Sequence, residues 1–322
     1  RDGISGLRAL PITNLAFAPH SDAVFSRSTL DERALRPWQD AGGVDATPIG
    51  VSFVNAAAED GGPSIDIALF GVEPGSFLAP ETGTPADGSL DGLVLDEELR
   101  EDGVKVGDRY TIAGSDVTLP VLGFTSAGSY GHAPIAFTSL DGWRWVVYGN
   151  DPRGRFSAIA LRVPDGVDTA ALAQASDTEV VTKEGAYDGS PGYTAEMATM
   201  TLIRGFLIVI SALIVGAFFT VLTVQRTRQI GLLKAMGAST LYVVRDGVAQ
   251  MAIVVALASI AGAVVGTAIV AALDGGPVPV ALDAGSIVMS VVLLVVTGIA
   301  GSLVTMRRIA RVPPAIALGV EP

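Results

Sequence analysis

Five side chains at the start of a long apolar segment have the types and the spacing of a ligand site. They are Tyr193, Glu196, Met197, Met200 and Arg204, at offsets 0, 3, 4, 7 and 11. This spacing places them on one face of an α-helix that begins near Thr194, just after a stretch rich in glycine and proline. A phenol, a carboxylate, two thioethers and a guanidinium on one face would suit an amphipathic ligand.

Packing is the simpler interpretation of the same face. Arg204 would then extend to lipid headgroups or pair with Glu196, while the two methionines only fill space. The sequence contains two histidines, His20 and His132, and neither is close to this face along the chain. The predicted ligand site therefore contains no imidazole.

The common catalytic motifs are absent from the sequence. There is no G-x-x-x-x-G-K-[ST] phosphate loop, and neither histidine stands in an H-E-x-x-H or G-x-S-x-G motif. We expect His132 to be a loop histidine rather than part of a Ser/His/Asp site. The chain has no cysteine, which removes disulfides and thiolate metal sites. We therefore expect no catalytic residue, no metal and no intrinsic cofactor.

An acidic cluster has a structural rather than a catalytic interpretation. Its members are Asp96, Glu97, Glu98, Glu101 and Asp102. Paired carboxylates can act as acid and base, but nothing apolar surrounds these residues in the sequence to raise a pKa. We expect a solvated helix face.

Three long apolar segments must position the candidate ligand face. We predict membrane helices at 194–224, 246–273 and 284–306, because about 20 apolar residues cross the hydrocarbon core as a helix. Buried helices of a soluble core are the alternative, but such helices seldom exceed 18 apolar residues three times in succession. The sequence therefore indicates a multi-pass membrane protein.

The positive charges predict the orientation of these helices. The segment 225–245 contains Arg226, Arg228, Lys234 and Arg245, and the tail 307–322 contains three arginines, whereas the loop 274–283 has neither Lys nor Arg. Cationic loops stay in the cytoplasm. We therefore expect 225–245 and 307–322 inside the plasma membrane, and 274–283 and the domain 1–193 outside it.

The charge is divided unequally along the chain. Residues 201–322 contain 8 Lys and Arg against 4 Asp and Glu, so most of the net charge of −12 comes from the first 200 residues. An acidic exterior domain argues against a nucleic-acid partner and suits solubility outside the cell. An exported domain of this size also needs a preceding translocation signal, so we expect a fourth membrane helix before residue 1.

The exterior domain 1–193 mixes predicted strands and helices without strict βαβ alternation, which favours an α+β fold. Helices are predicted at 29–39, with a hydroxyl cap at Ser28 or Thr29, and at 93–101 and 167–175. A long loop is predicted at 71–92. Extended segments are predicted at 7–18, 23–25, 48–54, 64–70, 135–138, 145–148, 158–163 and 179–182, with a hairpin at 104–125 that turns at Gly114 and Ser115.

Small residues recur in the second apolar segment. Ala258, Gly262 and Gly266 are spaced by four and share one helix face, and Gly298 and Gly301 give a weaker version in the third segment. Such a face lets another helix backbone approach closely. It would serve packing within one bundle or formation of a homodimer.

The polar segment between the first two helices carries a family resemblance. VLTVQRTRQIGLLKAMGAS, residues 221–239, resembles the signature of the FtsX-like permeases, and the similarity extends to the C-terminal RRIARVPPAIALG segment. The stretch VLDEELREDGVKVGDRYTI is similar to the exterior domains of the same permeases. The resemblance implies a MacB-type ABC transporter permease with four membrane helices. It also implies a homodimer that works with two copies of a separate cytoplasmic ATPase, which binds the ATP.

The resemblance implies that the segment around 225–240 couples the permease to that ATPase. The residues of this coupling segment are Arg226, Arg228, Ile230, Leu233, Lys234 and Met236. An apolar ridge with a cationic rim suits docking into a groove of a partner. A helix that lies on anionic lipid headgroups would show the same pattern.

A narrower resemblance concerns the cargo. The run GSPGYTAEMATMTLIRGFLIVISALIVGAFFTVLTVQRTRQIG is similar to haem exporter permeases of the HrtB type. It implies that a carboxylate, phenol or thioether of the ligand face approaches haem iron and that Arg204 approaches a propionate. Haem would enter from the outer leaflet between two copies and leave on ATP-driven closure. Other FtsX-like permeases act on exterior hydrolases without moving cargo, or export lipoproteins, peptides or antibiotics.

Overall fold

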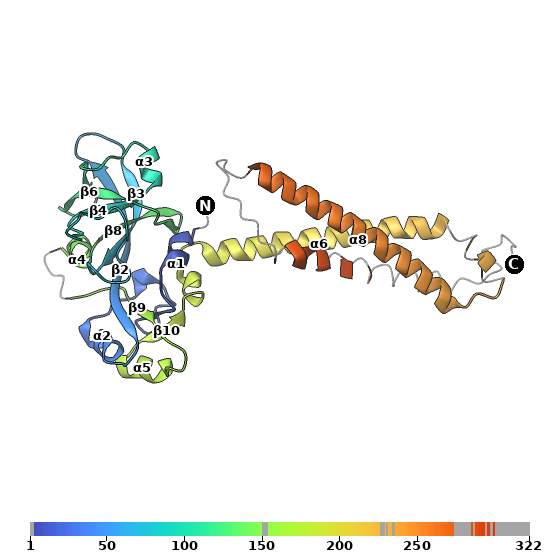
Figure 1. Cartoon of the computed structure of the whole chain (residues 1–322), viewed down its shortest axis with the longest axis horizontal. Helices are drawn as coiled ribbons and strands as arrows, with labels where there is room; N and C mark the ends of the chain where they lie inside the picture. The colour runs from blue at the N-terminus through green and yellow to red at the C-terminus, as the bar shows by residue number, and fades with distance from the viewer. Residues whose placement is uncertain are drawn as a thin grey trace. The chain divides into compact units, whose positions relative to one another are not determined.

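The structure is a computed structural model that describes residues 3–149, 154–225, 229, 231–233, 236–273, 285, 287–293, 295–296 and 299. The chain divides into two compact units, Arg1–Met197 and Ala198–Pro322. The first is built around a β-sheet and the second around long apolar helices (Figure 1). The two units are described separately.

One mixed sheet organises the first unit. Its order is β10-β1-β9-β2-β3-β8-β4-β6-β5, with β7 paired to β8. Most neighbours are antiparallel, while β3 with β8 and β4 with β6 are parallel. The strands are β1 (Asn14–Phe17), β2 (Asp45–Ala58), β3 (Ile65–Val72), β4 (Leu93–Asp96), β5 (Arg109–Ile112), β6 (Thr118–Thr125), β7 (Ser129–Tyr130), β8 (Ala133–Ser139), β9 (Ala158–Arg162) and β10 (Glu179–Thr182).

Strand β2 is long enough to serve two parts of this sheet. Its first residues, from Asp45 to Ile49, pair with β9, and its last three, from Ala56 to Ala58, pair with β5. Because β5 also pairs with β6, the strands β2, β3, β8, β4, β6 and β5 close into a small barrel. Closure removes the exposed sheet edges of this part of the domain.

The helices of the first unit are short and lie against the sheet. They are α1 (Ser5–Ala9), η1 (Phe25–Arg27), α2 (Glu32–Gln39), α3 (Glu98–Glu101), α4 (Leu140–Tyr148), α5 (Thr169–Ser176) and η2 (Gly185–Gly189). Helix α2 contacts α5, and α4 contacts β2 and β3 (Figure 1). Strands and helices are mixed without βαβ repetition, so the α+β expectation for this domain is confirmed.

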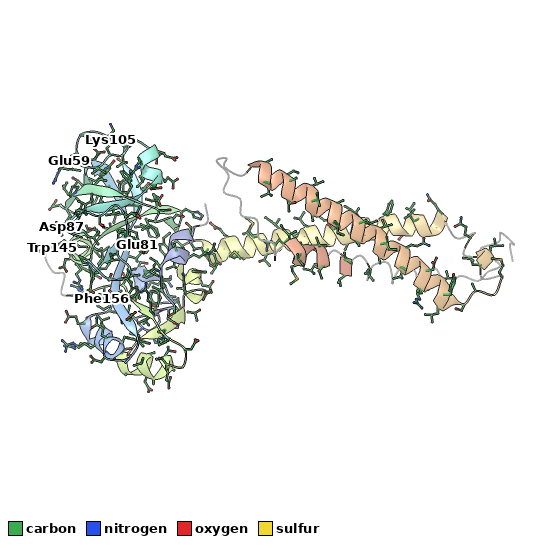
Figure 2. All side chains as sticks on the ribbon, in the orientation of Figure 1. Glu59, Glu81, Asp87, Lys105, Trp145 and Phe156 are labelled. Atoms are coloured by element: carbon green, nitrogen blue, oxygen red, sulfur yellow. The ribbon has the colours of Figure 1, made fainter. Side chains whose placement is uncertain are left out.

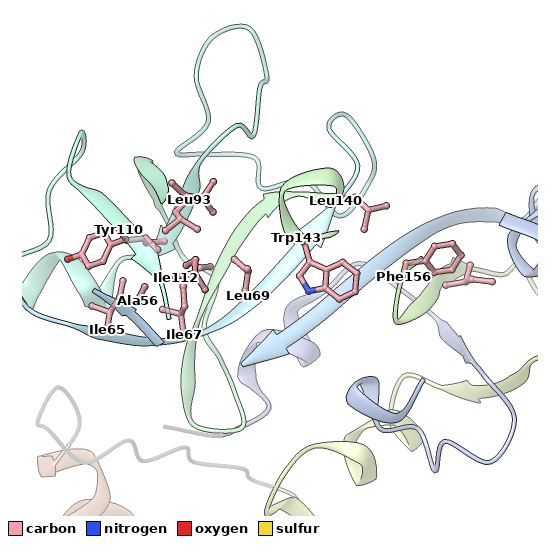
Figure 3. Close-up of a cluster of buried hydrophobic side chains, with 14 of the residues drawn as sticks. Ala56, Ile65, Ile67, Leu69, Leu93, Tyr110, Ile112, Leu140, Trp143 and Phe156 are labelled. Atoms are coloured by element: carbon pink, nitrogen blue, oxygen red, sulfur yellow. The ribbon is translucent and has the colours of Figure 1, made fainter. Parts of the chain in front are cut away.

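Two apolar clusters fill the first unit, one on each side of the sheet. The cluster in Figure 3 contains Leu69, Tyr110 and Trp143, all nearly inaccessible to solvent. Trp143 lies on the backbone of β2 and β3, where a Cβ added at Gly50 or Gly71 would approach its side chain to 2.2 and 2.3 Å. Its indole Nε1 donates to Ser52 Oγ at 3.1 Å. Glycine at these two positions is therefore required for α4 to pack.

Several predicted elements of this unit are confirmed. Strands β2 and β8 include all of the predicted 48–54 and 135–138. Strands β3 and β9 cover 65–70 and 158–162 of the predicted 64–70 and 158–163, and β10 matches the predicted 179–182. The hairpin β5–β6 turns where Gly114 adopts φ 80°. The loop after β3 runs from 73 to 92, and α5 covers most of the predicted 167–175.

Other predicted elements of this unit are wrong. Residues 145–148 belong to α4, because Ser139 caps that helix by accepting from Gly142 N at 3.1 Å and Trp143 fixes its packing. Residues 93–96 are the buried strand β4, followed by the short α3. Of the predicted segment 7–18, residues 7–9 belong to α1 and only 14–17 form a strand, β1. Residues 25–27 form the 3-10 helix η1. Helix α2 is capped by Asp31, which accepts from Arg33 N, rather than by Ser28 or Thr29.

Asp96 corrects the interpretation of the acidic cluster. Its side chain is buried, with Oδ2 accepting from Ala127 N at 2.9 Å and from Gly128 N at 2.7 Å. Oδ1 accepts from Glu98 N at 3.0 Å and so begins α3. This carboxylate is a structural acceptor inside the fold rather than part of a solvated face.

The second unit contains two helices that are long and apolar enough to cross a membrane. They are α6 (Tyr193–Gln225), which begins at the end of the first unit, and α8 (Thr240–Leu273). Their candidate spans are Tyr193–Leu222 and Leu241–Ala272, and almost nothing in them is buried. Figure 2 shows their side chains as almost entirely carbon, in contrast to the polar surface around Glu59, Asp87 and Lys105. Apolar side chains exposed along two such helices are expected in lipid rather than in water.

The third predicted helix, 284–306, lies largely outside the described residues. Residues 287–293 and 295–296 are helical. The predicted outer loop 274–283 and tail 307–322 lie outside the described part of the chain.

Candidate ligand site at the start of helix α6

The five predicted ligand residues all lie on α6. Gly192, with φ 81°, allows the sharp turn into this helix, and Glu196 N donates to Gly192 O at 2.9 Å. Tyr193 is half-buried, with its ring 6.1 Å from that of Tyr187 in an edge-on arrangement. Because all five are helical, their spacing puts them on one side of α6 as predicted.

Four of these side chains are exposed. Met197 is 46% and Met200 56% accessible, and Glu196 and Arg204 are also exposed. Long apolar side chains exposed beside a carboxylate and a guanidinium provide both parts of a surface for an amphipathic molecule. The role of these residues as a ligand site stays a prediction.

Glu196 has a partner that sequence reasoning missed. His132 Nε2 lies 2.6 Å from Glu196 Oε1, and both side chains are about half exposed. Since the carboxylate is the acceptor, the imidazole N–H donates. The expectation that no histidine is near this face is therefore wrong.

A tight turn places the imidazole at this position. Gly131 and His132 connect β7 to β8 and adopt φ values of 56° and 67°, as a two-residue hairpin of the type I′ class requires. The ring of His132 also faces the backbone of Gly3, where an added Cβ would lie 3.0 Å from the ring. A sequence signal existed, because Gly-His between two short β-prone stretches is a hairpin candidate.

Aromatic rings pack around Tyr130, the residue that precedes the same turn. Tyr130 stacks on Phe53 with centroids 5.6 Å apart and contacts Phe25 and Phe70 edge-on. Burial raises the pKa of the Tyr130 phenol, so this group stays neutral at physiological pH. Phe53 itself is 47% exposed and lies against Gly131. The surface beside His132 therefore includes an accessible aromatic face.

This arrangement offers an imidazole, a carboxylate and, one residue along α6, the thioether of Met197. Each of these groups can bind iron, and an aromatic face such as that of Phe53 suits a planar ligand. Among the described residues there is no cluster of three or more His, Cys, Asp or Glu that would hold a metal ion.

The predicted coupling residues are only partly described. Met236 is 70% and Leu233 38% accessible, so these two members of the proposed apolar ridge are exposed in the described part of the chain. Arg226, Arg228, Ile230 and Lys234 lie outside the described residues. The coupling role stays a prediction.

The small-residue face of α8 lines a hollow within the second unit. Ala258, Gly262 and Gly266 contribute to an open groove of about 790 Å³, together with α6 residues such as Ser211 and with residues from 287 to 291. A Cβ added at Gly262 or Gly266 would meet nothing within 4 Å. These glycines are therefore not packed against the described helices. Gly298 and Gly301 lie outside the described residues.

Comparison with known proteins gives one family match and several relatives. Residues 201–314 match the FtsX-like permease C-terminal family. The chain is 24% identical over 230 residues to the "Putative hemin transport system permease protein HrtB" of Staphylococcus haemolyticus. This alignment covers 70% of this chain and 63% of that protein. The protein of the same name from Staphylococcus epidermidis is 23% identical over 232 residues, with the same coverage. The chain thus spans less than two thirds of these relatives.

A solved structure also aligns with part of the chain. It is the extracellular domain of the ABC-type transporter YknZ from Gram-positive bacteria, with 13% identity and a TM-score of 0.35. The alignment covers 51% of this chain and 87% of that domain.

The family match falls on the apolar helices and on the segment that carries the Arg-x-Arg-x-Ile-Gly pattern. The chain therefore carries, at residues 201–314, the C-terminal domain of an FtsX-like permease.

Proposed function

We propose that this chain is the permease subunit of an ABC exporter that extrudes haem captured from the outer leaflet of the plasma membrane. The observation that carries the proposal is the face of Glu196, Met197, Met200 and Arg204, all exposed, beside the half-buried Tyr193 at the start of an apolar, unburied helix. Haem has a planar apolar body, a Lewis-acidic iron and anionic propionates. The face offers apolar contact, iron-binding atoms and one cation.

The comparisons support the transport class of this proposal. The permease domain match is to a family of ABC transporter subunits, and the relatives named for hemin transport cover 70% of this chain. The sequence contains no phosphate loop, so ATP hydrolysis would reside in a separate cytoplasmic ATPase. The exposed Leu233 and Met236 would contribute to its docking surface. Two copies of the permease would enclose the cargo between their α6 helices.

The test is a haem titration of the full-length permease in detergent or nanodiscs, followed by the Soret band. We expect saturable binding that is weakened about tenfold or more by Glu196→Ala or Met200→Ala, because each removes an iron-binding atom. Glu81→Ala, which removes an exposed carboxylate in the loop between β3 and β4, is the matched control and should leave binding unchanged. Absence of any haem spectrum would remove haem as cargo.

The same preparation with its ATPase subunit distinguishes an exporter from a force-transmitting permease. Haem should stimulate ATP hydrolysis by the complex, and the stimulation should fall in the Glu196→Ala variant. ATP hydrolysis that is indifferent to haem would contradict the proposal and favour a role on an exterior partner.

A further inference from the structure

The hydrogen bond between His132 and Glu196 joins two parts of the first unit that are distant in sequence. His132 lies in the β7–β8 turn, and Glu196 lies in the first turn of α6, 64 residues later. The bond occupies Oε1 of the carboxylate that the proposed function assigns to cargo. One oxygen of the Glu196 carboxylate is therefore already hydrogen-bonded within the first unit.

The two partners differ in how firmly they are held. The left-handed backbone at Gly131 and His132 and the Phe53–Tyr130 stack hold the turn that carries the imidazole, and the ring lies against Gly3. Glu196 has a flexible side chain on the exposed side of a helix, and among the described residues its carboxylate hydrogen-bonds only to His132. When the bond opens, the carboxylate is the group that moves.

We propose that His132 is a positioning residue, which keeps the Glu196 carboxylate hydrogen-bonded when no cargo is bound. An iron-bearing planar cargo breaks this hydrogen bond by competing for the carboxylate. This proposal rests on the proposed function and adds how cargo binding to the ligand face of α6 is regulated. The carboxylate oxygen passes from the imidazole N–H to iron, and the N–H is left to water. No covalent bond forms and no redox change occurs.

This exchange has a consequence for the exterior domain. Within the first unit the bond ties the start of α6 to the β7–β8 turn, and cargo removes that tie. Occupancy of the ligand face would then be signalled to the exterior domain as a loss of one fixed contact. Because one bond of this kind contributes a modest free energy, the exchange remains reversible.

If His132 competes with cargo for the Glu196 carboxylate, its removal should have the opposite effect on haem affinity from that expected if His132 helps to bind the cargo. His132→Asn removes the imidazole while keeping a residue that tolerates the left-handed backbone. If His132 competes with cargo, this variant should bind haem about two- to tenfold more tightly in a Soret titration. Weaker binding would show that His132 supports or ligates the cargo and would overturn the proposal. Unchanged binding would overturn it as well.

His20→Asn is the matched control. His20 is the other histidine of this sequence and has a comparable left-handed backbone, with φ 62°. It should not alter haem affinity. The double variant His132→Asn with Glu196→Ala should bind no better than Glu196→Ala alone, because the competitor acts only through that carboxylate.

A readout that does not depend on iron tests the pair itself. With ¹³C-labelled histidine and a tag without histidine, His20→Asn and His132→Asn identify the two signals of this sequence. We expect the His132 signal to shift in Glu196→Gln, and to shift in the same direction when gallium protoporphyrin IX binds the unmodified permease. If the His132 signal does not shift in Glu196→Gln, the hydrogen bond between His132 and Glu196 does not form and the proposal is wrong.

The two readouts separate the two proposals. If the unmodified permease shows no haem spectrum but the His132 signal responds to Glu196→Gln, haem is not the cargo while the pair exists. If haem binds and the His132 signal ignores the gallium porphyrin, the proposed function stands and the competition is wrong.

Discussion

Asp96 shows how a single charged residue can be structural in an acidic region. Its carboxylate accepts three backbone N–H groups, which join the end of β4, the start of α3 and the segment at 127–128. Accepting several N–H groups satisfies donors that would otherwise be buried without partners. The neighbouring Glu97 is exposed and has no comparable role.

Asp96→Ala should therefore destabilise the first unit by about 2–4 kcal/mol, because charged hydrogen bonds are lost and a buried N–H is left unsatisfied. Thermal or urea unfolding followed by tryptophan fluorescence measures the change. Glu97→Ala is the matched control and should shift stability by less than about 0.5 kcal/mol. Equal effects of the two substitutions would contradict the role of Asp96 as a structural acceptor.

His132 shows which part of the candidate site sequence could not predict. The positions from Tyr193 to Arg204 follow from helical spacing, which is a local property. The contact between His132 and Glu196 depends on the pairing of β7 with β8 and on where the chain after η2 enters α6. Such a contact across 64 residues is decided by tertiary packing and not by any pattern within a window.

At the level of elements, the placement of α4 depends on two glycines of the sheet. Residues 145–148 read as a strand because tryptophan, valine and tyrosine favour strands, yet they form the end of a helix. The local preference is overridden because Trp143 needs the flat surface that Gly50 and Gly71 provide. By contrast β2 and β3 were predictable, since their apolar runs agree with the sheet that buries them.

Gly71→Ala tests this dependence. The new Cβ would lie 2.3 Å from Trp143 Cβ, an atom close to the α4 backbone, so helix and sheet must separate. We expect a loss of about 1–3 kcal/mol in unfolding free energy and a shift in tryptophan emission. Gly42→Ala is the control, because an added Cβ there meets nothing within 4 Å and Gly42 has no positive φ. A loss of stability in Gly42→Ala equal to that of Gly71→Ala would contradict the explanation.

At the level of the whole molecule, the chain combines a sheet-containing first unit with helices that expose nearly all of their apolar surface. The first unit has its own cores, whereas the second unit has only a small buried cluster around Val255 among the described residues. Helices in lipid associate through close packing of small residues, so the second unit is expected to complete its packing with further helices.

The groove beside Ala258, Gly262 and Gly266 is where that packing is most easily tested. A leucine at Gly266 meets no described atom within 4 Å of its Cβ, so a lone chain would tolerate it. If another helix, from this chain or from a second copy, fills the groove in the assembled transporter, the leucine displaces it. We expect Gly266→Leu to reduce the dimer fraction in nanodiscs and to reduce haem-stimulated ATP hydrolysis.

Gly216→Leu is the matched control for this substitution. Gly216 lies on α6, has nothing within 4 Å of an added Cβ and is outside the lining of the groove. It carries the same added volume and the same gain in helix propensity as Gly266→Leu. A dimer fraction that falls equally in both variants would mean that bulk anywhere on these helices disturbs assembly. A fraction unchanged in Gly266→Leu would mean that no helix of a second copy occupies the groove.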